Sequence, residues 1–230
     1  MNVIDIDQFK ALFLKIKEKG YVKSMRKGST GVGKTLETLL GIKENNLIVP
    51  DLGEIELKAH REDSSNLITL FTFNRGQWVM NQLEAVRKYG IKDQYERLGL
   101  YFTMSFRQNS AGLFLHVDED YVSIKHIDGS TLVRWKFVDL EKQFKKKIPA
   151  LVLVYAKSEF RGDDEYFYFY KADYLREPDH SLVKEEIRNE TILIDLRLHD
   201  KGTMARNHGT AFRIYEKDLP KIFKYRNTIT

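Results

Sequence analysis

Two acidic side chains and a lysine stand close together in the segment IVPDLGEIELKAH. Asp51 follows a proline, and five residues later Glu56, Leu57 and Lys58 form a Glu-x-Lys tripeptide. A β-strand places Glu56 and Lys58 on one face, and Asp51, in the turn before it, reaches the same face. Converging carboxylates need a hard cation, and Mg²⁺ is bound by one or two carboxylates, waters and substrate phosphate. The spacing therefore predicts a Mg²⁺ site.

The same residues indicate hydrolysis of a phosphodiester bond. Lys58 can orient or help deprotonate an attacking water and stabilise charge on the phosphate, while the metal ion lowers the pKa of that water. We therefore predict Asp51, Glu56 and Lys58 as catalytic residues, and Asp51, Glu56 and Leu57 as metal ligands. The alternative is that Glu56 and Lys58 form only the polar face of a half-exposed strand. Against this, the tripeptide is the only Asp/Glu-x-Lys among 33 acidic residues.

A second motif, GSTGVGKT from Gly28 to Thr35, matches the phosphate-loop pattern G-x-x-x-x-G-K-[ST]. A phosphate loop needs a buried apolar strand that delivers its glycines to the N-terminus of a helix. Residues 22–27 read VKSMRK instead, with three cations in six positions. This context argues against nucleotide hydrolysis and against a nucleotide cofactor. The motif then predicts a loop that leads into a helix with Thr30 as its N-cap. DNA phosphate stays open as another anion that this loop could bind.

The composition indicates a chain with a sizeable core. Its 230 residues are 42% hydrophobic, enough for one large domain or two intimate lobes. The absence of cysteine excludes disulfides and thiolate metal sites, which fits a reducing cytoplasm. The sequence has no run of ~18 apolar residues and begins too polar for a signal peptide, so we expect a cytoplasmic protein without a membrane partner. A net charge of +5 permits a polyanionic partner.

The hydrophobic pattern predicts a mixed α/β chain. An apolar stripe predicts a helix over residues 5–19. The other predicted helices are 31–40, 77–89, 138–147, 181–189 and a short one at the C-terminus, and the predicted strands are 54–60, 67–73, 100–106, 112–117, 120–127, 131–137, 150–158, 165–171, 191–199 and 209–215. We therefore expect a helix–strand–strand–helix core in the first part of the chain. The second part is expected to be a largely antiparallel sheet.

Four segments together resemble the MvaI/BcnI family of type II restriction endonucleases, relatives of the MutH mismatch-repair nickase. They are MRKGSTGVGKTLETLL, PDLGEIELKAH, LITLFTF and HGTAFRI, in this order. The resemblance implies one endonuclease domain over 1–230 with a PD-(D/E)xK core, a catalytic lobe over 1–95 and a MutH-like, strand-rich DNA-recognition lobe over 96–230, around a cleft. It also implies Mg²⁺ as cofactor, double-stranded DNA as partner, a monomer, a cognate DNA methyltransferase, and cleavage at short CC-N-GG-like pseudopalindromes.

The resemblance carries catalytic roles onto Asp51, Glu56 and Lys58 and adds Glu37, from the helix after the glycine loop. That loop then serves the nuclease fold and not nucleotide hydrolysis. The predicted DNA-binding residues lie in two parts of the chain: Lys27, Thr30, Lys34 and His60 in the first, and Asp195, Arg197, Arg206, Asn207, His208 and Arg213 in the second. Residues 205–207 read Ala-Arg-Asn, where the MvaI-like pattern has a His-Asp pair, and this departure bears on the recognised site.

Several alternatives stay open on the sequence. Two other interpretations compete with a restriction endonuclease: a non-catalytic DNA-binding module and a MutH-like strand-nicking repair enzyme. The intact catalytic residues argue against the non-catalytic module. Asp195 and Arg197 share a strand face, so they either read bases or pair only with each other. The run KQFKKK, residues 142–147, is either a solvated helix end or a contact to the phosphate backbone.

Overall fold

The computed structural model describes residues 5–42, 50–62, 66–74 and 76–230, which divide into two compact units. Unit 1 comprises Met1–Ile68, Lys145–Asp179 and Tyr215–Thr230, and unit 2 comprises Thr69–Phe144 and His180–Ile214. This division differs from the lobes expected over 1–95 and 96–230, because strands from the last third of the chain pair with a strand from the first third. Such long-range pairing leaves no trace in the local pattern.

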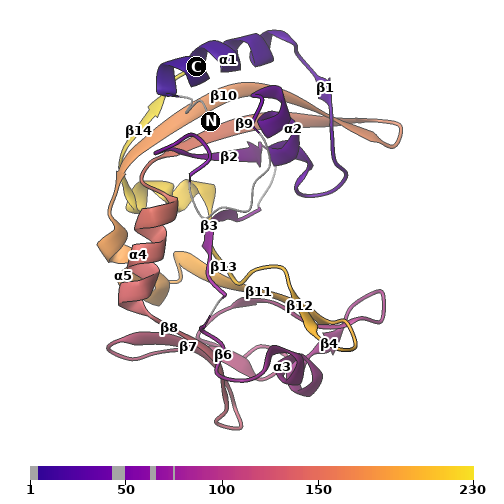
Figure 1. Cartoon of the computed structure of the whole chain (residues 1–230), viewed down its shortest axis with the longest axis vertical. Helices are drawn as coiled ribbons and strands as arrows, with labels where there is room; N and C mark the ends of the chain where they lie inside the picture. Colours follow the sequence, from indigo (N-terminus) through magenta and orange to yellow (C-terminus); the bar gives the residue numbers. More distant parts are fainter. Residues whose placement is uncertain (1–4, 43–49, 63–65, 75) are drawn as a thin grey trace. The chain divides into compact units, whose positions relative to one another are not determined.

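Unit 1 is built on a five-stranded sheet of order β1-β10-β9-β2, with β14 paired to β10 (Figure 1). Its strands are β1 (Val22–Lys23), β2 (Glu56–Arg61), β9 (Leu151–Arg161), β10 (Asp164–Pro178) and β14 (Phe223–Thr228). β2 pairs parallel with β9, whereas β10 is antiparallel to β1, β9 and β14. The parallel register sets Lys58 beside Leu153 and His60 beside Tyr155.

One face of this sheet is covered by the helices α1 (Ile6–Glu18) and α2 (Gly31–Leu39), as Figure 1 shows. α1 begins at Asp5, whose side chain accepts hydrogen bonds from the main-chain N–H groups of Asp7 and Gln8 in a capping box. The apolar side chains of both helices pack against alternate residues of the strands, among them Leu57, Val152 and Val154. A 3-10 helix, η2 (Glu216–Lys221), precedes β14.

Unit 2 contains two sheets and most of the remaining helices. The six-stranded sheet has the order β3-β13-β11-β5-β4 with β12 paired to β11, and the three-stranded sheet the order β6-β7-β8. The strands are β3 (Ile68–Thr72), β4 (Ile91–Lys92), β5 (Leu98–Met104), β6 (Leu113–Val117), β7 (Tyr121–His126), β8 (Thr131–Lys136), β11 (Ile192–Asp200), β12 (Ala205–Asn207) and β13 (Ala211–Ile214). The helices are α3 (Gln82–Tyr89), α4 (Phe137–Lys147), whose last turn belongs to unit 1, η1 (His180–Leu182) and α5 (Val183–Arg188).

Aromatic side chains fill the core of unit 2. Phe71 stacks on Phe212 with ring centroids 4.7 Å apart, and Trp135 meets Phe212 edge-on at 5.4 Å. Both contacts have the offset or perpendicular geometry that aromatic pairs prefer. The indole N–H of Trp135 donates to the carbonyl of Phe73 at 2.9 Å, which satisfies the one polar atom of this buried side chain.

The mixed α/β class and the largely antiparallel sheets are confirmed, but three expected details are wrong. β2 and β3 belong to different sheets, so the helix–strand–strand–helix core does not form. The helix expected from residue 77 begins at Gln82, because Val79 and Met80 donate to Leu132 and Asn81 caps the helix. The short helix expected after residue 215 is present as η2, but it is not the last element, because strand β14 follows it. No helix in the described ranges is long and apolar enough to cross a membrane.

Candidate active site

The strand β2 presents Glu56 and Lys58 on the sheet face opposite α1 and α2. Period-two geometry produces this arrangement, because Leu57, between them, packs into the helix-covered core. Glu56 is only 1% exposed, and the ammonium group of Lys58 forms an ion pair with its Oε1 atom. Asp51 lies in the turn before β2, where its Oδ2 atom accepts a hydrogen bond from the main-chain N–H of Leu57 at 3.3 Å. The structure thus brings Asp51, Glu56 and Lys58 to the start of one strand.

A second lysine also reaches Glu56. Lys147, the last residue of α4, places its Nζ atom 2.8 Å from Glu56 Oε2. The sequence interpretation missed this contact because it treated the lysine run as a unit. A usable signal was present, since Phe137, Leu140 and Phe144 form the buried stripe of α4 and Lys147 continues it by helical spacing. Lys145 and Lys146, by contrast, are exposed.

The donor atoms at this place suit a hard divalent cation. Among the residues that the structure describes, no group of three or more His, Cys, Asp or Glu side chains could hold a metal ion. Mg²⁺ needs fewer, since one or two carboxylates suffice when waters and a phosphate complete its shell. Glu56 Oε2 is buried, and its partner among the described residues is the ammonium group of Lys147. The carboxylates of Asp51 and Glu56 and the main-chain carbonyl of Leu57 are oxygen donors of the kind that Mg²⁺ binds, so these residues fit the ion.

The glycine loop does not have the structure of a nucleotide site. The strand before it, β1, has two residues and pairs only with β10 among the described strands, so the glycines do not follow a buried central strand. The Thr35 hydroxyl, which holds Mg²⁺ in a phosphate loop, is fully buried here. It donates to the carbonyl of Gly31 at 2.8 Å and accepts from the N–H of Met25 at 3.0 Å. Through these two bonds the Thr35 hydroxyl connects Met25, which precedes the loop, to Gly31, the first residue of α2.

An arginine of β2 contacts the main chain of the glycine loop. Arg61 Nη1 donates to the carbonyl of Ser29 at 3.0 Å, Nη2 donates to the carbonyl of Gly28 at 3.1 Å and to Glu165 at 2.9 Å, and Nε donates to Glu165 at 2.8 Å. The loop therefore offers carbonyl oxygens to a cation of the same chain. This geometry supports a loop that is braced against β2 and argues against a phosphate cradle.

The predicted residues around the loop have separate environments. Thr30 is the N-cap of α2, but its side chain makes no capping hydrogen bond, so that detail of the prediction is wrong. Lys27 is exposed and lines an open pocket that Arg26, Arg61 and the acidic residues 163–165 also line. Lys34 and Glu37 are half-buried on α2. The predicted roles of all four in DNA binding or catalysis stay predictions.

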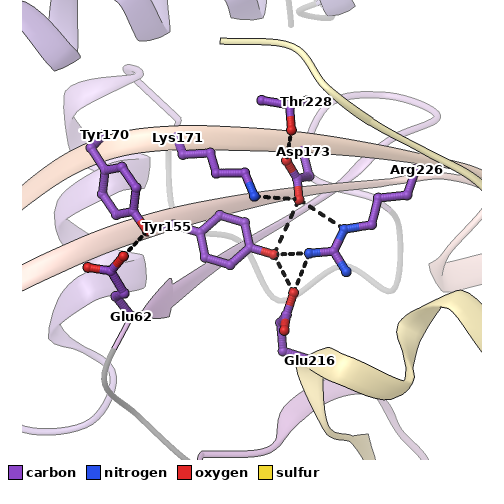
Figure 2. A network of polar contacts seen from close by, with 8 residues as sticks. All are labelled: Glu62, Tyr155, Tyr170, Lys171, Asp173, Glu216, Arg226 and Thr228. Atoms are coloured by element: carbon purple, nitrogen blue, oxygen red, sulfur yellow. Dashed lines mark hydrogen bonds and ion pairs between the residues drawn. The ribbon is translucent and has the colours of Figure 1, made fainter.

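His60 continues the face of β2 that bears Glu56 and Lys58, and it leads into a polar network. The imidazole is 9% exposed and meets the ring of Tyr155 edge-on, with centroids 6.3 Å apart. Figure 2 shows the network beyond it, which joins β9, β10, η2 and β14. Its links are Arg226–Asp173 at 2.9 Å, Lys171–Asp173 at 3.2 Å, Thr228–Asp173 at 2.8 Å, Tyr155–Glu216 at 2.6 Å, Arg226–Tyr155 at 2.5 Å, and the ion pair between Arg226 and Glu216.

The charges of this network are set by competing effects. Burial alone would raise the pKa of Asp173, but hydrogen bonds from Thr228, Arg226 and Lys171 hold the pKa below its usual value. Glu216 behaves in the same way, with Tyr155 and Arg226 outweighing burial. Burial raises the pKa of the Tyr155 hydroxyl, so that group stays protonated. The network therefore ties the C-terminal strand to the sheet next to the candidate catalytic residues.

In unit 2, three predicted DNA-binding residues meet on one face of the six-stranded sheet. Asp195, 6% exposed, accepts hydrogen bonds from Arg213 at 2.7 Å and from the Thr103 hydroxyl at 2.8 Å, and it forms an ion pair with Arg197 at 3.1 Å. Thr103 was not predicted, because its place beside Asp195 depends on the pairing of β5 with β11. The side chain of Arg197 is 47% exposed. The structure thus contains the Asp195–Arg197 pair of the alternative interpretation and leaves Arg197 accessible.

The other predicted recognition residues lie where β12 ends. Arg206 and His208 are exposed, whereas Asn207 uses its Oδ1 atom to accept from the N–H of Gly209 at 2.8 Å. His208 stacks on His199 with centroids 5.2 Å apart, and Tyr101 bonds His199 Nδ1 at 2.8 Å. Burial lowers the pKa of both histidines, and nearby cations lower it further. The stacked pair is therefore neutral near pH 7.

Comparisons with known proteins agree on one family. The model of the MvaI/BcnI restriction endonuclease family matches residues 10–223. A solved complex of the restriction endonuclease MvaI with its cognate DNA substrate is similar over 97% of this chain and 98% of that chain, with 26% identity and a TM-score of 0.84. MvaI in the absence of DNA is similar over 100% and 99%, with 25% identity and a TM-score of 0.52.

No curated protein sequence matches the chain. The family match nevertheless spans nearly the whole chain, and the similarity to solved structures covers both units. The chain belongs to the MvaI/BcnI restriction endonuclease family.

Proposed function

We propose that this chain is a Mg²⁺-dependent type II restriction endonuclease that cuts both strands of double-stranded DNA. The family supports a site-specific DNA endonuclease, and one similar solved structure is a complex with a DNA substrate. The observation that carries the metal dependence is Glu56, a carboxylate that is 1% exposed and lies beside Asp51 and the ammonium group of Lys58. A buried carboxylate of this kind is weak evidence for a stabilising role, because an apolar side chain of similar volume often serves stability as well.

The proposed roles follow from the positions of the side chains. Asp51, Glu56 and the main chain of Leu57 would hold Mg²⁺. When bound, the ion lowers the pKa of a water and neutralises charge on the phosphate oxygens. Lys58 extends from the same strand face as Glu56, so its ammonium group orients the attacking water and stabilises the negative charge that develops on the phosphate. Glu37 is the fourth proposed member of the site, from the adjoining helix α2.

The proposed recognition site is a short CC-N-GG-like pseudopalindrome. In unit 2, Arg197 and Arg213 share Asp195 as counter-ion, so the carboxylate holds two guanidinium groups in a fixed orientation. An oriented guanidinium is the group that pairs with the O6 and N7 atoms of guanine in the major groove. Arg206, Asn207 and His208 are further proposed contacts, and Lys27, Thr30, Lys34 and His60 are proposed contacts of unit 1. We also propose a monomer and a cognate DNA methyltransferase as its genetic partner.

One digestion experiment tests this function. A plasmid of known sequence is incubated with the protein in Mg²⁺, and the ends are mapped by sequencing. The proposal expects defined double-strand breaks that share one short sequence, and no cleavage in EDTA. Nicked circles that never become linear would identify a strand-nicking enzyme instead. Intact plasmid in Mg²⁺ and Mn²⁺, with retained DNA binding, would identify a module that only binds DNA.

A further inference from the structure

Lys147 is the feature that the proposed catalytic roles leave unexplained. Its ammonium nitrogen lies 2.8 Å from Glu56 Oε2, while Lys58 engages Oε1 of the same carboxylate. The Lys147 side chain is 19% exposed, less than the 26% of Lys58. Long lysine side chains are seldom buried to this degree unless they are paired. The two ammonium groups together carry a charge of +2 beside this carboxylate. The proposed metal ion would bring the same charge to the same place.

The electrostatics of Glu56 explain why a second cation is present. A carboxylate removed from water is costly unless cations compensate it, and removing its partner leaves an uncompensated buried charge. Lys58 alone leaves the Oε2 side of Glu56 without a partner that bears charge. Lys147 supplies that charge from the end of α4, so the folded protein tolerates an ionised Glu56 before any metal arrives.

A divalent ion and Lys147 compete for the same oxygen. Mg²⁺ binds carboxylate oxygens at 2.0–2.1 Å, so an ammonium nitrogen 2.8 Å from that oxygen would lie close to the ion. Like charges at such a separation repel strongly where water is scarce. The charge of Lys147 therefore opposes the binding of a divalent ion to Glu56, and moving Lys147 away from Oε2 relieves the repulsion.

We propose that Lys147 is a positioning residue that stands in for the metal ion, holding Glu56 in the metal-free protein and lowering the affinity of the site for divalent cations. The inference rests on the proposed function, because it takes Glu56 as a metal ligand. Its consequence is that free protein loads metal weakly. A DNA phosphate adds negative charge beside the site, which offsets the ammonium groups and makes metal loading favourable only on the substrate.

The test compares Lys147→Met with Lys146→Met. Methionine keeps an unbranched chain and removes the charge, and Lys146 is an exposed neighbour whose loss changes the net charge equally. Binding of Mn²⁺ to the protein without DNA is measured by calorimetric titration. Lys147→Met should bind Mn²⁺ about tenfold or more tightly than the parent, because the competing charge is gone. Lys146→Met should match the parent.

Thermal unfolding gives a second readout that does not depend on activity. Without metal, Lys147→Met should unfold at a lower temperature than the parent, and saturating Mn²⁺ should raise its unfolding temperature by more than it raises that of the parent. If Lys147→Met does not fold, Lys147→Gln keeps a neutral hydrogen-bond donor beside Oε2 and should show the same tighter binding.

The outcomes separate this inference from the proposed function. If the parent cleaves DNA with Mg²⁺ but both Lys147 variants bind Mn²⁺ no more tightly than the parent, the inference is overturned and the proposed function stands. A fall in the cleavage rate with unchanged Mn²⁺ affinity overturns it too, because Lys147 would then act on the phosphate. If no variant binds Mn²⁺ and the parent does not cleave with any divalent ion, both fail together.

Discussion

Replacing Arg226 by methionine should lower the free energy of unfolding of unit 1. The loss should be larger than the loss from replacing any other charged side chain of β14. Arg226 is the cation in Figure 2 that pairs with both Asp173 and Glu216, and the Tyr155 hydroxyl contacts the same two carboxylates. Asp173 is 1% exposed, so its charge depends on its partners. Methionine preserves the apolar stem of Arg226 and removes its guanidinium group.

The magnitude follows from burial. Removing one partner of a fully buried pair costs about 3–5 kcal/mol. Here Arg226 is 26% exposed, and Asp173 keeps Lys171 and Thr228, so we expect a loss of about 2–3 kcal/mol in the free energy of unfolding. For a chain of this size that corresponds to roughly 5–10 °C in the unfolding temperature. Lys224→Met, two residues earlier on β14, breaks a pair that is 64% and 60% exposed, so its unfolding temperature should stay close to that of the parent.

Calorimetry and hydrogen exchange together make the assay. Both tryptophans, Trp78 and Trp135, lie in unit 2, so their fluorescence follows unit 2 while calorimetry follows the whole chain. Exchange should increase in β10 and β14 of Arg226→Met and remain unchanged in unit 2. If Arg226→Met and Lys224→Met unfold at the same temperature, the network contributes no more than an exposed ion pair and the reasoning fails.

The network also predicts a response to acid. Asp173 and Glu216 have pKa values held below their usual range against the effect of burial. A depressed pKa contributes stability above the unfolded-state pKa of about 4, and this stability is lost as the pH falls through the folded-state value. Because Arg226 is among the groups that depress both values, Arg226→Met should unfold in acid at a higher pH than the parent. An unchanged acid midpoint would contradict this assignment.

Three further predictions concern unit 2 and the loop. Burial is the main cause that lowers the pKa values of His199 and His208, so the unfolded chain takes up protons at a higher pH than the folded chain. The unfolding temperature should therefore fall as the pH drops below about 6.5. His199→Gln should weaken this pH dependence, and an unfolding temperature that falls as steeply with pH in the variant as in the parent would contradict the prediction. Arg197→Ala should lower discrimination between the cognate duplex and single-base variants by ~1–3 kcal/mol in Ca²⁺ titrations, whereas an equal loss for all duplexes would make it a backbone contact. Lys34→Ala should leave ATP turnover at background and cleavage independent of ATP, and a saturable ATPase lost in this variant would restore the nucleotide interpretation.

The local part of the candidate site could be read from the sequence. Asp51, Glu56 and Lys58 lie within eight residues, so the period of one strand decides which of them share a face. The helix α1 was equally accessible, because its apolar stripe and its stop are local features. Such predictions depend on a few neighbouring residues and on no distant contact.

What the sequence could not supply depends on pairing between distant segments. Unit 1 combines segments that are distant in the sequence, because β9 pairs with β2 while β10 pairs with β9 and β14, and no local pattern specifies these partners. For the same reason Lys147 was not connected with Glu56, nor Thr103 with Asp195. The contact from Arg61 to the glycine loop also joins residues about thirty positions apart in the sequence, so no local pattern predicts it.

The most direct test of the central claim is cleavage of a cognate plasmid in Mg²⁺ by the parent, Lys58→Ala and Glu56→Gln, with Glu54→Gln as an exposed control two residues away. DNA binding is measured in Ca²⁺ for all four proteins. We predict that Lys58→Ala and Glu56→Gln lose several kcal/mol of transition-state stabilisation, at least about a hundredfold in rate, and still bind DNA. Glu54→Gln should cut at the parental rate. Cleavage by Lys58→Ala at near the parental rate would show that the chemistry takes place elsewhere.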